Sequence, residues 1–290
     1  MLVKGLSFAL LMSCAAPATV QAAESTPMVI ADVGFLGSEA ARYDDRRDEY
    51  LVSNRGPSPA ADISFISRVS PDGAVAELKW IEHGRNGVQL LDPLGIFPHG
   101  DKLYVADIAA VRIFDRRTGA PRGSVDIPDA VRLNDLAVAP DGTIYVSDSG
   151  SDDAPGAIFR ITGAGRVSPF VARDPALERV NGIAVMPDGS VVHGGRGVNL
   201  VFRSPKGDIL REVTLPTGRI DGIVPLKDGS LLVASQDGHN VYHVPAGAGK
   251  PVVVARDIPV PAAIGLDTKR YRLLVPQIQA ASLTIVELAR

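Results

Sequence analysis

Short apolar runs separated by polar turns recur along most of this chain. The clearest unit, Val180–Val192, consists of one polar residue, an apolar run, an Asp-Gly turn and a second apolar run. Leu133–Tyr145 and Ile220–Leu232 have the same layout. Asp-Gly tolerates the positive φ angles that tight hairpin turns need. Each unit therefore predicts a β-hairpin whose first strand opens on the polar residue.

Three weaker copies follow the same frame, in Pro93–Tyr104, Ser38–Val52 and Pro261–Val275. The residues that open the six copies are Glu39, Pro93, Asn134, Asn181, Asp221 and Ala262. They recur at intervals of about 40–54 residues, and such periods are typical of β-propellers. We therefore predict an all-β, six-bladed β-propeller with almost no helix. The strand at 283–288 is expected to share the last blade with one near 28–31, which would close the ring.

The first residues have the features of a secretory signal peptide. Lys4 precedes an apolar run, and Val20–Ala22 ends in the small-x-small pattern of a cleavage site. The run is too short for a membrane span. We predict a signal peptide over 1–22, one propeller domain over 23–290, and a periplasmic or secreted protein. Leu11–Cys14 also resembles a bacterial lipoprotein box, so lipidation at Cys14 is the alternative.

Charge and cysteine content narrow the class of partner. The chain has 30 basic and 33 acidic residues, a net charge of −3, and Cys14 is its only cysteine. No basic patch interleaved with aromatic residues is present, so nucleic acid is not expected as a partner. The propeller must hold by packing without disulfides. The expected partner is a small molecule, and the expected state is a monomer.

The six opening positions should face one another, because the innermost strands of a propeller surround its axis. Four of them carry oxygen donors: Glu39, Asn134, Asn181 and Asp221. Two unpaired carboxylates at close range repel each other, and a divalent cation would relieve that repulsion. Oxygen donors without His or Cys favour Ca²⁺ or Mg²⁺, with Mn²⁺ and Zn²⁺ as alternatives. The competing interpretation is that Asn-Gly and Asp-Gly pairs only form turns.

Three segments resemble the gluconolactonase/regucalcin family, also called senescence marker proteins. Arg132–Asp135, followed by Pro140–Gly142, resembles the family's R-x-N-D…P-x-G stretch. Asn181–Ala184, Asp221-Gly222 and the Asp-Gly pairs behind them resemble its later segments. The resemblance implies a six-bladed propeller with one divalent metal ion, of which Ca²⁺ is the most expected, and an activity on sugar lactones.

The family's site residues transfer by position. The resemblance implies that Glu39, Asn181 and Asp221 bind the metal, that Arg132 and Asn134 hold the substrate, and that Asp221 is also the general base. Glu39 is followed by Ala40–Tyr43, where the family usually has Gly-Pro-x-Trp.

Two functions of different classes remain at this point. The first is an exported, metal-dependent hydrolase of a sugar lactone or similar small ester. The alternative is a non-catalytic propeller of the NHL-repeat kind that serves as a binding or scaffolding module. The filled donor positions favour the enzyme, because a scaffold does not need them.

Overall fold

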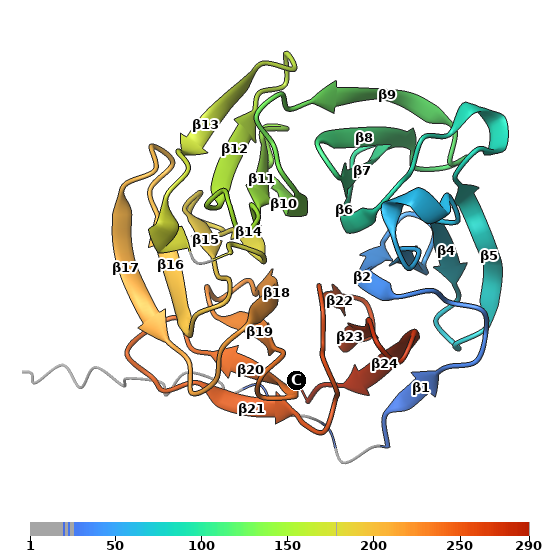
Figure 1. Ribbon diagram of the computed structural model, residues 1–290. Coiled ribbons are helices and arrows are strands. Elements are labelled where there is room, and N and C mark those ends of the chain that lie inside the picture. Colours follow the sequence, from blue (N-terminus) through green and yellow to red (C-terminus); the bar gives the residue numbers. More distant parts are fainter. Residues whose placement is uncertain (1–19, 21–22, 24–25, 178, 290) are drawn as a thin grey trace, which may run out of the picture.

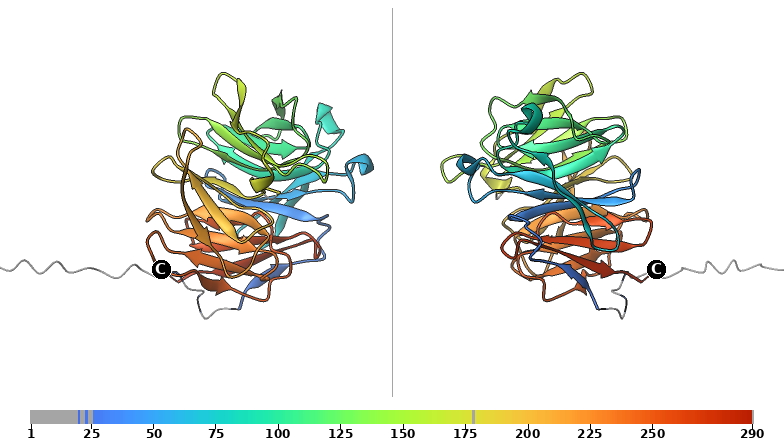
Figure 2. Two further views of the ribbon diagram at one scale, coloured as in Figure 1. Left: turned by 60° about the vertical axis from the view of Figure 1, so that its left-hand side comes forward. Right: turned by 90° about the vertical axis from the view of Figure 1, so that its right-hand side faces the viewer.

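The computed structural model describes residues 20, 23, 26–177 and 179–289 of this chain. These residues form six four-stranded antiparallel sheets arranged around a common axis (Figure 1). Side views show neighbouring sheets stacked face to face around the ring (Figure 2). The six-bladed propeller predicted from the repeat is therefore confirmed.

The blades are numbered 1 to 6 in chain order, and each has one strand at the axis and one at the rim. The inner strands are β2 (Ser38–Asp44), β6 (Pro93–His99), β10 (Leu133–Val138), β14 (Ile183–Val185), β18 (Ile220–Pro225) and β22 (Gly265–Asp267). The second strands are β3 (Glu49–Asn54), β7 (Lys102–Asp107), β11 (Ile144–Asp148), β15 (Val191–His193), β19 (Leu231–Ser235) and β23 (Arg272–Gln277).

The two remaining positions of each blade lie farther from the axis. The third strands are β4 (Phe65–Val69), β8 (Ala110–Asp115), β12 (Ala157–Ile161), β16 (Asn199–Arg203), β20 (Asn240–Val244) and β24 (Ser282–Glu287). The outer strands are β5 (Val75–Glu82), β9 (Pro121–Asp126), β13 (Val167–Val171), β17 (Ile209–Thr214), β21 (Val252–Ala255) and β1 (Met28–Ile30). Among the described residues, the only helical pieces are three 3₁₀ turns, at Pro59–Ala61, Arg85–Gly87 and Pro175–Leu177.

The inner and second strands are nearly fully buried, because each blade packs between two others. Apolar clusters fill these interfaces, and Leu51, Val105 and Val233 are completely inaccessible to solvent. Continuous apolar runs, rather than strict alternation, are what such two-sided burial requires.

Glycine allows the inner strands to approach one another closely. A Cβ atom at Gly182 would lie 1.6 Å from the carbonyl oxygen of Asp221 in the next blade. A Cβ atom at Gly222 would lie 2.2 Å from the backbone nitrogen of Ile264 in the blade after that. The Asn-Gly and Asp-Gly pairs at these positions are therefore packing devices and not hairpin turns.

Two sets of contacts close the ring. The first strand, β1, pairs antiparallel with β24, with Met28 opposite Ile285, so the two ends of the chain share blade 6 as predicted. At the axis, Ala263 N–H donates to the carbonyl of Glu39 at 2.9 Å, and Ala41 N–H donates to Ala263 at 3.0 Å. These bonds remove the free edge that an open ring of sheets would leave.

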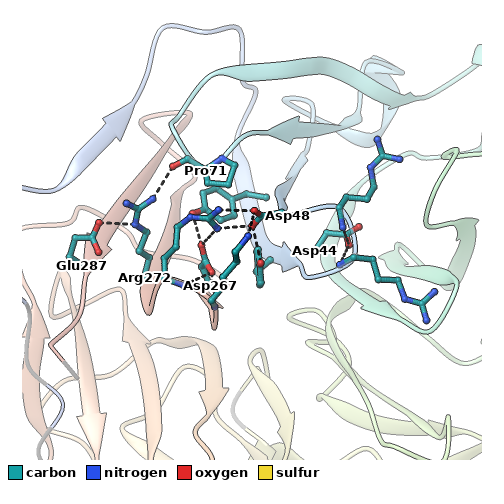
Figure 3. A network of polar contacts seen from close by, with 12 residues as sticks. Asp44, Asp48, Pro71, Asp267, Arg272 and Glu287 are labelled. Atoms are coloured by element: carbon teal, nitrogen blue, oxygen red, sulfur yellow. Dashed lines mark hydrogen bonds and ion pairs between the residues drawn. The ribbon is translucent and has the colours of Figure 1, made fainter.

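A group of charged contacts lies where blades 1 and 6 meet, and its pair of Arg270 with Asp48 joins the two blades (Figure 3). We call this group the blade 1–6 joint; its members are Asp48, Asp267, Arg270, Arg272 and Glu287. Arg270 donates to Asp48 at 2.7 Å and to the fully buried Asp267 at 2.9 Å, and Arg272 donates to Glu287 at 2.7 Å. Every carboxylate of the joint meets a guanidinium group.

The predicted signal peptide and Cys14 lie outside the described residues, apart from Val20. No helix among the described residues is long and apolar enough to cross a membrane.

Candidate active site at the propeller axis

Local distortions of the inner strands position the predicted donors. The pairing of β2 with β3 shifts register between Ser38 and Ala40, which places Glu39 in a bulge. Similar register shifts occur in β10, around Asn134, and in β18, around Asp221. A bulge turns a side chain away from the regular pleat, so three of the four donors are aimed by the same device.

Asn181 is placed differently from the other three donors. The sequence pattern predicted that it opens a strand, but β14 begins two residues later, at Ile183. Gly182, between Asn181 and this strand, is where the carbonyl of Asp221 in the next blade approaches closely. Asn181 N–H still donates to Gly194 at 2.8 Å, which fixes the residue beside β15.

Three buried oxygen atoms at the axis have no hydrogen-bond partner among the described residues. They are Oε2 of Glu39, Oδ1 of Asn181 and Oδ1 of Asp221. The other oxygen of Asp221, Oδ2, accepts hydrogen bonds from Gln236 at 2.7 Å and from Asn181 at 3.2 Å. A buried acceptor without a partner is costly, so these three oxygens are the atoms of the ring that could hold a cation. We call Glu39, Asn181 and Asp221 the axial set.

The pKa values of the two axial carboxylates are both raised. Burial raises the pKa of Glu39 from 4.5 to about 7, although Arg55 and Arg132 oppose the rise. Burial also raises the pKa of Asp221 well above its ordinary value, and the negative charge of Glu39 raises it further. The charge of Glu39 thus disfavours the ionised form of Asp221.

The donor set suits a hard cation better than a soft one. Among the described residues, no three side chains of His, Cys, Asp or Glu converge on one point. The axial set reaches three donors only through the amide oxygen of Asn181, and all three are oxygens. Carboxylate and amide oxygens are typical Ca²⁺ and Mg²⁺ ligands.

The residues predicted to hold a substrate line a polar cavity of about 250 Å³ beside the axial set. Arg132, Asn134, Asn181 and Gln236 all border this polar cavity. Asn134 donates to Ser149 at 3.0 Å, which orients its amide. The structure therefore brings Arg132 and Asn134 to the same cavity as Asn181, with Asp221 directly behind it.

Asp92 is a site residue that the sequence pattern did not reveal. Its carboxylate is buried and lies 3.1 Å from Arg55 and 3.2 Å from Arg132. These contacts fix Arg132 at the cavity wall. Asp92 directly precedes Pro93, the opening position of blade 2, so its position in the repeat was the one available signal.

A second missed element, the pair formed by Arg42 and Asp135, crosses the axis. Arg42 donates to the carbonyls of Ala263 at 2.8 Å and Ile264 at 2.6 Å, and to Asp135 at 3.2 Å. Arg42 also borders an apolar cavity of about 280 Å³, whereas Asp135 follows Asn134 of the polar cavity. The ion pair therefore links the inner strands of blades 1 and 3, and the backbone contacts of Arg42 extend the link to blade 6.

Fold and site together define a six-bladed propeller with an acidic, oxygen-lined centre. Residues 62–264 match the family described as SMP-30/Gluconolactonase/LRE-like region. The chain belongs to this family, as its motifs indicated. No curated protein matches the sequence.

Several solved structures share the architecture. A gluconolactonase from Xanthomonas campestris superposes with a TM-score of 0.67 at 16% identity, covering 95% of this chain and 99% of that one. The calcium-binding protein regucalcin from Agrobacterium tumefaciens gives 0.64 at 14% identity, covering 90% and 93%. Virginiamycin B lyase from Staphylococcus aureus also gives 0.64 at 14% identity, covering 91% and 99%. A lyase shares this fold, so the fold alone does not define the reaction.

Proposed function

We propose that this protein is a metal-dependent hydrolase of a sugar lactone or a similar small ester. The observation that carries the proposal is the set of three buried, unpartnered oxygens of Glu39, Asn181 and Asp221. The family match and the gluconolactonase among the similar structures support the reaction class.

The axial set fits a divalent ion. Glu39 and Asp221 would neutralise its charge, and Asn181 would supply a third oxygen. Ca²⁺ is the first candidate, because all three donors are hard oxygens and a regucalcin described as calcium-binding shares the fold. Mg²⁺, Mn²⁺ and Zn²⁺ are the alternatives. When bound, such an ion would act as a Lewis acid toward the lactone carbonyl and lower the pKa of water.

The protein's own groups would do the rest of the chemistry. Gln236 and Asn181 both donate to Oδ2 of Asp221, so the carboxylate is held with Oδ1 toward the other donors. Asp221 would accept the proton of the attacking water as general base. Arg132, braced by Asp92, and Asn134 would orient the hydroxyl groups of the substrate. The ion pair of Arg42 with Asp135 would keep the inner strands of blades 1 and 3 in place beside the site.

A lactone panel with matched variants tests the proposal. Purified protein is stripped with chelator and assayed with each of the four ions. We expect lactone hydrolysis to return with at least one ion. Asp141→Asn serves as the control variant, because Asp141 is an exposed residue of a hairpin turn. Retention of metal without cleavage of any lactone would favour the alternative, a binding module of the NHL-repeat kind.

We also propose that the protein is exported and cleaved after Ala22. The support is the small-x-small sequence Val20–Ala22. The intact mass of the exported protein tests this directly. A mass that includes an acylated Cys14 would contradict it and place the protein on a membrane surface.

A further inference from the structure

The polar cavity is bordered by four arginines and, among its described lining residues, by no carboxylate. The arginines are Arg132, Arg179, Arg196 and Arg219. A cavity that only has to bind the hydroxyl groups of a neutral sugar has no need of so many cations, since amides and hydroxyls serve that purpose.

Three of these arginines occupy the same place in consecutive blades. Arg132, Arg179 and Arg219 each lie two residues before an axial position, namely Asn134, Asn181 and Asp221. Each of the three lies before the inner strand of its blade rather than within it, and all three border the polar cavity. The repeat that supplies the oxygen donors at the axis thus also supplies guanidinium groups to this cavity, a set that we call the arginine layer. Arg196, from the loop between β15 and β16, adds a fourth cation to that layer.

Most arginines of this layer are only weakly paired with carboxylates, so their positive charge is available to a ligand. Arg132 pairs with the buried Asp92. Arg179 pairs with Asp152, whose side chain is 95% exposed, and Arg219 lies 3.8 Å from Asp237, which is about half exposed. Such exposed pairs are weak and are easily exchanged for a ligand.

Arg196 has no ion-pair partner among the described residues, and its side chain is exposed at the cavity. A divalent ion at the axial set would neutralise Glu39 and Asp221 beneath the arginines. The cavity would then be positively charged over the whole space that a substrate ring would occupy.

We propose that the substrate is an anionic lactone, one that carries a carboxylate or a phosphate in addition to its lactone ring. This inference rests on the proposed hydrolase function. The lactone carbonyl would lie toward Asp221, and the anionic group would lie among Arg179, Arg196 and Arg219. Planar guanidinium groups bind carboxylate and phosphate oxygens with paired, charge-assisted hydrogen bonds.

Matched substrates test the proposal and separate the two anions. The metal-loaded protein is assayed with a neutral hexonolactone, the same lactone with a terminal carboxylate, and the same lactone with a terminal phosphate. We expect kcat/KM to be about tenfold higher for at least one charged lactone than for the neutral one. Added salt should reduce this preference, because the arginines are partly exposed.

A double variant assigns the preference to the arginine layer. Arg196→Gln/Arg219→Gln should reduce the ratio of charged to neutral kcat/KM from about tenfold to about twofold. The matched control is Arg166→Gln, an exposed arginine in the turn before β13 that does not border the polar cavity. The control should keep the full ratio. Equal rates for all three lactones, or an equal loss in the control, would overturn the proposal.

A binding measurement keeps this proposal separate from the hydrolase function. Glucose, glucuronate and glucose 6-phosphate have similar rings and no lactone carbonyl, and their affinities are compared by calorimetry. Tighter binding of a charged sugar, lost in the double variant, supports the anion-binding cavity even if no lactone is cleaved. Lactone hydrolysis without any preference for charge, in rate or in binding, would leave the hydrolase function intact and contradict this inference.

Discussion

Carboxylates at the blade 1–6 joint and carboxylates at the axial set have opposite surroundings: among the described residues, the former are paired with cations, and the latter are not. At the joint, Asp267 accepts hydrogen bonds from Tyr50 at 2.8 Å and Arg270 at 2.9 Å. Hydrogen bonds from Arg270 and Lys269 hold the pKa of Asp48 well below its usual range. At the axis, burial raises the pKa values of both Glu39 and Asp221, and the charge of Glu39 adds to the rise at Asp221.

The difference shows which carboxylates serve the fold and which serve the site. A buried carboxylate that stabilises a fold is paired, because an unpaired one destabilises it. The axial set breaks this rule with two carboxylates from blades 1 and 5. Proteins keep such strained arrangements where a ligand relieves them, so the axis is where we expect function.

The largest expected effect is on activity, at the axis. Asp221→Asn keeps the shape of the side chain but removes an anionic ligand and the proposed base. We expect hydrolysis to fall by about 10²–10⁴-fold or more. Arg132→Ala should lose less activity than Asp221→Asn. Part of its loss should appear as a higher KM, because Arg132 is proposed to orient the substrate. Steady-state kinetics on a cleaved lactone measures both, with circular dichroism to verify folding. Near-full activity of Asp221→Asn would contradict the mechanism.

At the joint, the expected effect is on stability. Asp267→Asn removes the charge that Arg270 and Tyr50 share, within a fully buried group. We expect the free energy of unfolding to fall by about 1.5–3 kcal/mol, as for the loss of hydrogen bonds to a charged group, because Arg270 keeps its bond to Asp48. Chemical denaturation measures it, with the exposed Asp141→Asn as control. A loss no greater than that of the control would mean that the joint is not a structural element.

In the metal-free protein, replacing an axial carboxylate should raise the free energy of unfolding rather than lower it. Asp221→Asn removes one of two repelling charges, so we expect the metal-free variant to be more stable than the native protein at pH 8, by about 1–2 kcal/mol. Thermal melts in chelator measure this difference. Destabilisation comparable to that of Asp267→Asn would show that Asp221 is an ordinary structural carboxylate.

The pH dependence of the metal-free protein follows from Glu39. Its pKa is raised to about 7 from 4.5, so between these values the folded state holds more protons than the unfolded state. The free energy of unfolding therefore falls as pH rises from about 4.5 to about 7. Melts of the metal-free protein across this range measure the fall, and Glu39→Gln should reduce it. The same slope in Glu39→Gln would assign the effect to other groups.

The smallest expected effect lies at the exposed edge of the joint. Arg272 and Glu287 are 22% and 38% exposed, so Glu287→Gln should cost less than about 1 kcal/mol, and salt should reduce the cost further. Denaturation at low and high salt measures it. A cost equal to that of Asp267→Asn would show that burial does not decide the strength of these pairs.

The sequence predicted the architecture because a propeller repeats one local unit. Asp-Gly hairpins such as that after Asn181 are local features, and their period determines the number of blades. The shared last blade was predictable for the same reason, since a ring with free edges would aggregate. The competing interpretation of Asn181-Gly182 as a turn is wrong, because close approach of the next blade's backbone explains Gly182.

The axial residues were predictable by position, but their supporting contacts were not. Gln236 holds Asp221, and both belong to one blade, yet nothing in the hairpin pattern singles out Gln236. Asp92 and Arg42 act on residues of other blades, through contacts that span many positions of the chain. Such contacts depend on how the blades are arranged around the axis.

Calorimetric titration of chelator-stripped protein with Ca²⁺, and then with Mg²⁺, Mn²⁺ and Zn²⁺, tests most directly whether the axial carboxylates form a metal site. We predict that one ion per chain binds at pH 8, that affinity falls as the pH is lowered toward 5, and that Asp221→Asn abolishes binding while Asp141→Asn does not. Absence of stoichiometric binding by all four ions would contradict the account.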